Sequence, residues 1–496
     1  MSKFLFPGKD HSPMTLSRMS RAGEARRIRQ GVYTDVTNDD DIAELIHNRW
    51  HELVDHLCTR PIAAFRTAVE LRPHDNRVYV MADVASRRYL EIGKWLVIDV
   101  MPGQSQAGAE PFMPHLLRSA PARQYLENLS KARERDGVIK TLGQDWVEKA
   151  LTKNLQDRGE AYLNTLRDEA RDLAGTLGRE DEFKQLDKII GALLNSHPVE
   201  GALTSDLAIA AAKREPFDGY RTDRFQSLID YLAQCPFTPA PFEFNTASWR
   251  NLSFFESYFS NYIEGTEFEI DEAEQIVFEN KIIDNRTEDS HDIMSVYAMV
   301  SDHQEMLDVP DSPSSFIEML QSRHARMMAQ RPDKNPGQFK RRRNQAGNSV
   351  FVDPGNLVGT LTRGFEMSEE VAPGLAQAIY MQFLISECHP FDDGNGRLSR
   401  VFLNAELVNK DQCKVIVPTV ARENYLNGLR MATREGAFRT LVKVFYQLQQ
   451  YTASLPWIDY GEAREALEQD AAHQHPNDGT PTFNRRIRDY RIQLPR

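Results

Sequence analysis

A short polar loop lies between two strongly apolar segments in the C-terminal half of this 496-residue chain. The loop, residues 389–396, contains one proline and two glycines, which are typical of tight turns. Apolar side chains at helical spacing precede it over residues 379–385 and follow it over residues 398–407. The pattern predicts a tight loop between two buried helices, which is a rigid frame for functional side chains.

The length of the chain exceeds what one hydrophobic core usually organises, so two or three domains are expected. The formal net charge of -12 gives no overall attraction for nucleic acid or an anionic membrane. No apolar stretch approaches the roughly 20 residues that span a bilayer, and the first residues lack a long apolar run. The four cysteines have no CxxC spacing, which argues against a disulfide framework or a zinc site. We therefore expect a soluble, cytoplasmic protein, and the sequence leaves homo-oligomerisation open.

Composition and periodicity divide the chain into four segments and predict a mainly α protein. Residues 1–100 mix an amphipathic helix with short β-rich runs, and residues 101–197 have a helical pattern. Residues 198–470 are again helical and contain the loop. Residues 471–496 are polar and charged, with few large apolar side chains, and are expected to be flexible or to bind a partner.

The most basic segment of the chain lies near its start and includes Arg26, Arg27 and Arg29. These arginines are compatible with a winged-helix wing that contacts DNA phosphates, and equally with a solvated basic surface. The runs SRMSRAGEARRIRQGVYTD and RPIAAFRTAVEL loosely resemble the bacterial abortive-infection antitoxin and regulator family, over residues 14–196. This resemblance implies a winged-helix-like region followed by a helical domain.

Phosphate is the natural guest of the loop. Gly394-Asn395-Gly396 allows backbone N–H groups to converge on an anion, and the helix that begins near Arg397 adds its N-terminal partial charge. Arg397 and Arg400 are three residues apart, so they lie on one helix face and can bind successive phosphates. A polyphosphate therefore fits better than a single anion.

Two further side chains complete the chemistry of the loop. Asp393 can hold Mg²⁺ against bound phosphates, because hard cations prefer carboxylate oxygens and usually share substrate phosphates. His389, at the end of the preceding helix, can accept a proton from an incoming hydroxyl. Cys388 beside it is expected to be a buried thiol.

The loop sequence HPFDDGNGRLSR resembles the Fic motif HPFxDGNGRxxR at every specified position, and the wider likeness runs over about residues 217–457. The resemblance implies an all-helical core that transfers AMP from ATP to a hydroxyl of a target protein. By position, His389 would be the general base, Asp393 the Mg²⁺ ligand, and residues 394–396 the phosphate nest. Arg397 and Arg400 would hold the β- and γ-phosphates.

A second motif lies upstream at a predicted helix end, where Ser260, Glu264 and Gly265 are similar to the Fic inhibitory pattern [S/T]xxxE[G/N]. The resemblance implies that Glu264 pairs with Arg400 and denies the γ-phosphate its productive position. A carboxylate can compete with phosphate oxygens for the same guanidinium donors. In some relatives the same glutamate positions a water for removal of AMP, and the sequence leaves this open.

A predicted hairpin at residues 335–354 corresponds to the flap that aligns the target in Fic proteins. Val350, Phe351 and Val352 are the candidate target contacts, and the basic run at residues 340–343 is alternatively an anion-binding patch. Farther along, Asn424 and Tyr425 resemble the family segment that borders the adenine pocket.

The resemblance favours an autoinhibited protein adenylyltransferase that uses ATP and Mg²⁺ and has an unknown target. Two other functions remain open. One is an ATP-sensing transcriptional regulator, and the other is a single-chain toxin–antitoxin or phage-defence protein with the same enzymology.

Overall fold

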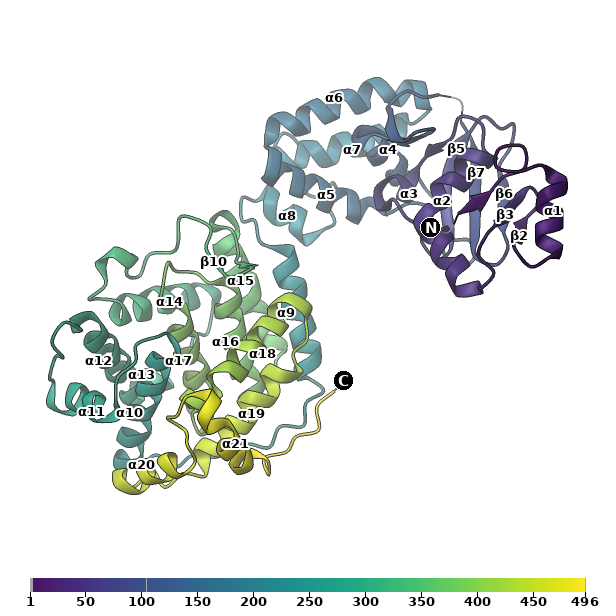
Figure 1. Ribbon diagram of the computed structural model, residues 1–496. Coiled ribbons are helices and arrows are strands. Elements are labelled where there is room, and N and C mark those ends of the chain that lie inside the picture. Colours follow the sequence, from purple (N-terminus) through teal and green to yellow (C-terminus); the bar gives the residue numbers. More distant parts are fainter. Residues whose placement is uncertain (1–2, 104, 496) are drawn as a thin grey trace. The chain divides into compact units, whose positions relative to one another are not determined.

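The computed structural model describes residues 3–103 and 105–495, which form two compact units, Met1–Arg214 and Glu215–Arg496 (Figure 1). Helices predominate, so the expectation of a mainly α chain is confirmed. None of the described helices is both long and apolar enough to cross a membrane.

The N-terminal unit begins with a three-stranded sheet of order β1-β3-β2 and one helix. These elements are β1 (Phe4–Leu5), α1 (Pro13–Arg21), β2 (Arg26–Arg29) and β3 (Val32–Thr34). Two of the three arginines considered for DNA binding are engaged within the unit. Arg26 pairs with Asp39, and Arg29 donates to the carbonyl of Glu91. Only Arg27 remains fully exposed, so the sequence overestimated the free charge on this strand.

A six-stranded mixed sheet of order β6-β7-β5-β4-β9-β8 follows the helix α2 (Asp39–Leu57). Its elements are β4 (Ile62–Ala63), α3 (Phe65–Glu70), β5 (Arg77–Ala82), β6 (Arg88–Ile92), β7 (Leu96–Pro102), β8 (Ala109–Met113) and β9 (Leu116–Ser119). The pairs β5–β7 and β4–β9 are parallel, and the other neighbours are antiparallel. The α+β region thus extends past residue 100, because β8 and β9 complete its sheet.

Five helices complete this unit: α4 (Pro121–Leu129), α5 (Gly143–Arg158), α6 (Glu160–Leu177), α7 (Glu180–Leu193) and α8 (Asp206–Ala212). The expected boundary near residue 198 lies earlier than the observed one, because α8 packs against α5 and α7. Its buried Ala208 and Ala212 belong to the same core as those helices.

The C-terminal unit is helical apart from one hairpin. Its first helices are α9 (Gly219–Leu232), α10 (Thr246–Ile263), α11 (Ile270–Glu279), α12 (Thr287–Ser301), α13 (His303–Leu307) and α14 (Pro313–Met327). The hairpin strands β10 (Gln345–Ala346) and β11 (Ser349–Val350) lie between two 3₁₀ turns, η1 (Pro332–Lys334) and η2 (Pro354–Asn356). The remaining elements are α15 (Leu357–Met367), η3 (Ser368–Glu370), α16 (Leu375–Cys388), α17 (Asn395–Val408), η4 (Thr419–Ala421), α18 (Arg422–Glu435), α19 (Arg439–Ala453), α20 (Tyr460–Gln469) and α21 (Pro476–Ile487).

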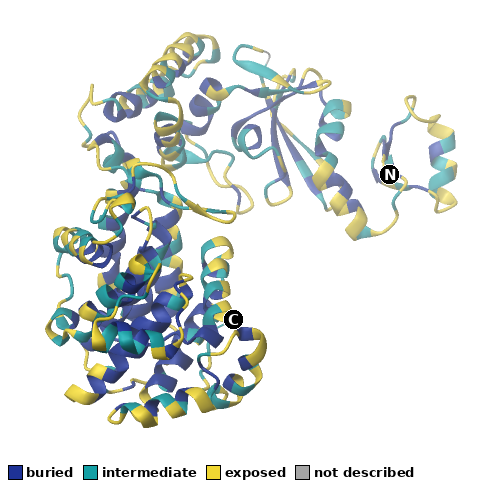
Figure 2. Cartoon of the chain, turned by 60° about the vertical axis from the view of Figure 1, so that its left-hand side comes forward, coloured by how far each residue is buried: buried dark blue, intermediate teal, exposed yellow. Residues whose placement is uncertain are grey.

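The helices α16 and α17 form the centre of this unit and pack along each other (Figure 2). All but two residues of α16 and all but one residue of α17 are buried. This agrees with the sequence prediction of two buried helices on either side of the loop. The loop that joins them is therefore held at both ends by the core.

The C-terminal segment is more ordered than its composition predicted. Residues 471–487 pack on the unit through a few small or aromatic side chains, among them Ala472 and Phe483, which are 0% and 2% exposed. The ring of Phe483 lies edge-on to that of Tyr451 on α19. The expectation of a flexible tail fails here because these few apolar residues all face the core.

Candidate functional site

The motif loop is fixed by its own residues before any ligand is considered. His389 ends α16 in the left-handed conformation, with φ 48°. Gly394 has φ 75° and begins α17. The Asn395 side chain spans the loop: its Oδ1 accepts from the Phe391 N–H at 2.9 Å, and its Nδ2 donates to the Phe391 carbonyl at 2.8 Å. Asn395 therefore shapes the loop with its side chain and leaves its backbone N–H to the helix end.

His389 has the environment of a general base. Its ring stacks on Phe351 with centroids 3.9 Å apart, and its Nδ1 lies 3.4 Å from the Ser386 carbonyl. A carbonyl only accepts, so Nδ1 carries the proton and Nε2 keeps its lone pair. Burial lowers the pKa of His389 to about 4, and the Lys340 ammonium acts in the same direction. The imidazole is thus neutral at physiological pH.

The first turn of α17 forms an anion nest. The backbone N–H groups of Asn395, Gly396 and Arg397 have no acceptor within the helix, as at any helix N-terminus. Asp393 lies beside them, and its Oδ1 accepts from the Gly394 N–H at 2.7 Å. This arrangement fits a phosphate group.

The donors also fit Mg²⁺ if the substrate supplies oxygens. The second carboxylate oxygen of Asp393 makes no hydrogen bond within the described chain, and the residue is exposed. Among the described residues, no group of three or more His, Cys, Asp and Glu could hold a metal. Asp393 is therefore the residue that would hold the ion, together with substrate phosphates, where Mg²⁺ neutralises developing charge.

Arg400 is fully engaged by the end of α10. Its Nη2 donates to Glu264 Oε1 at 2.7 Å and to the Ser260 carbonyl at 2.9 Å, and its Nε donates to Ser260 Oγ at 3.0 Å. Burial lowers the pKa of Arg400, but the Glu264 carboxylate more than offsets this, so the pKa lies above its ordinary value. Gly265, with φ 93°, turns the chain directly after the glutamate.

Glu264 also lies directly over the nest. A Cβ atom added to Gly396 would overlap the Glu264 carboxylate. The carboxylate therefore occupies the space in front of the N–H groups of the first turn of α17. An anion in the nest and Glu264 in this position exclude each other by both volume and charge.

Arg397 is held by a different carboxylate. Its Nη1 lies 2.8 Å from Asp292 Oδ2 and 3.3 Å from Asn261 Oδ1. Asp292 is in turn bound by Arg331, whose Nη2 lies 2.8 Å from the same oxygen. Asp292 and Arg397 are both almost fully buried. The two motif arginines are thus each paired with one acid, from α12 and from the end of α10.

His324 on α14 connects the loop to the segment before the hairpin. The Gly337 N–H donates to its Nδ1 at 2.9 Å, so its Nε2 carries the proton and donates to the Asp393 carbonyl at 3.0 Å. The ring stacks on Phe391 with centroids 3.7 Å apart. Burial lowers the pKa of His324 to about 4, which keeps this donor arrangement neutral.

Lys340 and Asn344 hold the other carbonyls of the loop. The Lys340 ammonium donates to the Cys388 carbonyl at 3.1 Å and to Asn344 Oδ1 at 2.7 Å. Asn344 Nδ2 donates to the carbonyls of His389 and Phe391. Burial lowers the pKa of Lys340 to about 8. Because Lys340 is buried, it does not join a surface anion patch with the arginines that follow it.

The expected hairpin is present, and its three candidate target contacts differ in position. Val350 is 50% exposed, and its carbonyl accepts from Arg221. Phe351 covers the His389 ring. Val352 is fully buried in the core. Val350 and Phe351 are therefore the side chains that an approaching protein could meet.

Asn424 and Tyr425 lie on different faces of α18. Tyr425 is buried, with its hydroxyl 3.0 Å from Gln382 Nε2 and its ring 5.8 Å from the Arg400 guanidinium. Asn424 is exposed and lines a separate pocket between α18, α19 and α21. The structure therefore brings Tyr425, and not Asn424, together with the motif.

Sequence reasoning did not identify Asp292, His324, Lys340 or Asn344 as parts of the site. Asp292 and His324 lie on helices without a motif, and only folding brings them to the loop. Lys340 was read as surface charge, although its place just before the hairpin was the available signal. Cys388 is a fully buried thiol, and burial raises its pKa to about 12.

Comparisons with known proteins match the part of the chain that carries this site. Residues 315–407 match the model of the Fic/DOC family. The chain is 26% identical over 209 residues to "Protein adenylyltransferase Fic" of Drosophila persimilis, covering 40% of this chain and 39% of that protein. It is 29% identical over 137 residues to the Drosophila grimshawi protein of the same name, covering 27% and 28% of the two chains. The chain thus spans about two fifths or less of these relatives.

Solved structures with related folds were also found. One is Fic-1 from C. elegans, with a TM-score of 0.38 and 15% identity, covering 65% of this chain and 98% of that chain. Another is IbpAFic2 in complex with adenylylated Cdc42, with a TM-score of 0.30 and 14% identity, covering 62% and 98%.

Proposed function

We propose that this chain, whose C-terminal unit carries a domain of the Fic/DOC family, is a protein adenylyltransferase that transfers AMP from ATP to a hydroxyl side chain of another protein. The observation that carries the proposal is the convergence, on one loop, of a neutral buried histidine, an anion nest and a free carboxylate oxygen. Relatives that share this domain are named as protein adenylyltransferases.

Each step of the transfer has a residue in place. The β- and γ-phosphates of ATP bind at the nest and at Arg397 and Arg400, and Asp393 holds Mg²⁺ against them. His389 Nε2 takes the proton from the target hydroxyl as its oxygen bonds to the α-phosphorus. The bond from the α-phosphorus to the bridging oxygen breaks, and pyrophosphate leaves. Positioning and charge neutralisation supply most of the rate, and the base contributes about 10²–10⁴-fold.

Glu264 restrains this activity in the proposal. Its carboxylate pairs with Arg400 and fills the space before Gly396, where a phosphate would have to lie. ATP can bind productively only when Glu264 leaves. If the Glu264→Gly substitution raised transfer tenfold, the restraint would be worth about 1.4 kcal/mol. The same carboxylate is close enough to the nest to orient a water, so removal of AMP from a modified protein is included in the proposal.

The target binds along the hairpin, whose exposed edge and Val350 are available for strand addition beside His389. The thiols of Cys58, Cys235, Cys388 and Cys413 are all free, which suits a reducing compartment. We therefore place the reaction in the cytoplasm.

The test is transfer of AMP from α-labelled ATP with Mg²⁺ in a host lysate. Three forms are compared: wild type, Glu264→Gly, and Glu264→Gly combined with His389→Ala. We expect strong labelling of other proteins by the single variant only. Absence of label in all three, with ATP still bound, would refute the proposed activity.

A further inference from the structure

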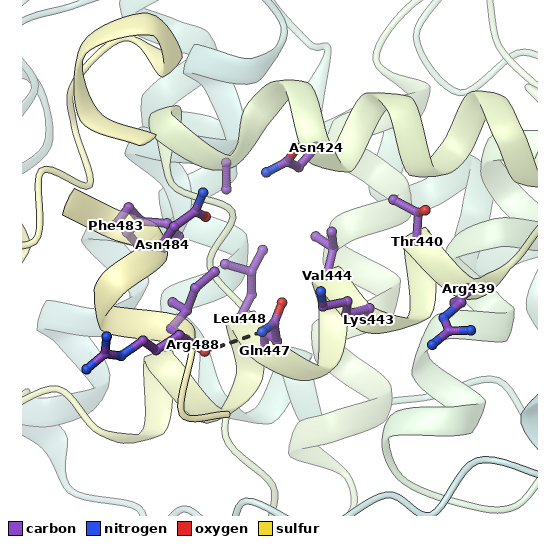
Figure 3. A pocket seen from close by; sticks show the side chains of 12 residues that line it. Asn424, Arg439, Thr440, Lys443, Val444, Gln447, Leu448, Phe483, Asn484 and Arg488 are labelled. Carbon is purple, nitrogen blue, oxygen red and sulfur yellow. Dashed lines mark hydrogen bonds between the residues drawn. The ribbon is translucent and has the colours of Figure 1, made fainter. Parts of the chain in front are cut away.

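A second pocket, of about 510 Å³, lies in the C-terminal unit between α18, α19 and α21 (Figure 3). Its volume is within the roughly 300–1,000 Å³ typical of small-molecule sites. Its apolar lining comes from Val444, Leu448, Phe483 and Ile487. This surface suits a flat apolar group, and none of the residues that line it belongs to the motif loop.

The rim of the pocket is positively charged. Arg439 and Lys443 on α19, and Arg488 just after α21, are its ionisable lining residues, and no described carboxylate is among them. This is unusual in a chain with 72 acidic and 60 basic residues. Within the described chain, Arg439 and Lys443 have no hydrogen bond or ion pair, and Arg488 has only an exposed neighbour, Asp489, at 3.7 Å. The positive charge is therefore available to a ligand.

Neutral polar groups complete the lining. In Figure 3 the amides of Asn424 and Asn484 reach into the pocket from α18 and α21. Gln447 donates to the Ile487 carbonyl at 3.3 Å, which ties α19 to α21 beneath them. Free amides can both donate to and accept from heteroatoms of a ligand.

We propose that this pocket binds a small organic anion in which a phosphate group is attached to an aromatic body. The apolar floor takes the ring, the amides contact its polar atoms, and the cationic rim takes the phosphate. The pocket is separate from the motif loop, so it is a second site and not part of the ATP site.

The position of Asn424 connects this pocket to the restraint on the motif, a consequence that rests on the proposed adenylyltransferase function. Two residues before it, Arg422 Nε donates to the carbonyl of Ile263, the residue directly before Glu264, at 3.0 Å. One residue after it, Tyr425 lies beside Arg400. A ligand that moves this turn of α18 would loosen both contacts. We expect it to release Glu264 and raise transfer.

Binding is tested on the whole chain with 1-naphthyl phosphate as the probe, followed by isothermal titration calorimetry. The double variant Arg439→Gln with Lys443→Gln should weaken binding about tenfold or more, because it removes two charge-assisted contacts. Arg485→Gln is the matched control, since Arg485 lies on α21 but does not line the pocket. 1-Naphthol and inorganic phosphate should each bind more weakly than the probe.

The pocket proposal is overturned if wild type does not bind the probe, or if the double variant binds it as well as wild type does. It is also overturned if inorganic phosphate alone binds as tightly, because the apolar floor would then have no role.

The connection to Glu264 is tested by AMP transfer with and without the probe. In wild type the probe should raise transfer by about fivefold or more, within the usual range of coupling between sites, and the double variant should not respond. An unchanged wild-type rate, with Glu264→Gly active, would refute the connection alone. An inactive Glu264→Gly form would refute the proposed function and leave the binding result standing.

Discussion

At the scale of single residues, the site is defined by protonation states and by pairs of opposite charges. His389 is a base because burial, with help from Lys340, lowers its pKa to about 4. Its neutral form therefore dominates throughout the neutral pH range. This gives a prediction that is opposite to that for an ordinary histidine, which would lose its base form near pH 6.5.

The transfer rate of the Glu264→Gly form should stay constant from about pH 8 down to about pH 6 and fall only as the pH approaches 4. The reason is that protonation of His389 is confined to the pH range around its lowered pKa. Single-turnover transfer measured across this range is the test. A midpoint near 6.5 would show that His389 is not buried as described.

Removal of Arg400 should change nucleotide preference more than overall binding. Arg400 is the donor that Glu264 occupies, and in the proposal it takes the γ-phosphate when Glu264 leaves. In a Glu264→Gly background, Arg400→Ala should lower the affinity for ATP by about tenfold while the affinity for ADP changes little. Calorimetric titration with both nucleotides measures this. An unchanged ratio of the two affinities would remove the γ-phosphate from the role of Arg400.

His324 offers a test of how the metal ligand is held. Its Nε2–H donates to the Asp393 carbonyl and its ring stacks on Phe391. The His324→Ala substitution should raise the Mg²⁺ concentration needed for half-maximal transfer by about tenfold, because groups that orient a metal ligand typically contribute 10–100-fold. A lower maximal rate with the same Mg²⁺ dependence would instead indicate a general loss of loop order.

At the scale of elements, two segments meet the motif loop from outside: the end of α10, with Glu264, and the hairpin. The hairpin's role can be separated from catalysis through Val350, which is half exposed and does not touch the loop in the described contacts. Val350→Asp should reduce modification of targets at least fivefold by disturbing strand addition, and leave ATP affinity unchanged. If modification is unaffected, the target approaches by another surface.

The elements also show how far the sequence alone could lead. The loop between two buried helices, the helix end at Glu264 and the hairpin were predictable, because each is recorded in local spacing, in a glycine or in a short motif. Asp292 and His324 were not predictable, because their roles depend on contacts between helices far apart in the chain. The helix α21 was missed because only a few of its side chains, among them Phe483, face the core.

At the scale of the whole molecule, the chain consists of two units joined near Arg214, and every residue of the proposed site lies in the second. A fragment of residues 215–496 should therefore fold alone, since it has its own core. It should retain the response to Glu264→Gly within about threefold, because both carboxylate–arginine pairs lie inside it. Circular dichroism and AMP transfer measure the two properties. A folded fragment that is active without the substitution would show that the first unit contributes to the restraint.

The most direct test of the account is which part of ATP is transferred. Purified Glu264→Gly protein is incubated with a host lysate, Mg²⁺ and ATP labelled at either the α- or the γ-phosphate, with the Glu264→Gly, His389→Ala form as control. The account predicts protein-bound label from the α-phosphate only, and none with the control. Label from the γ-phosphate, or α-label that persists without His389, would contradict it.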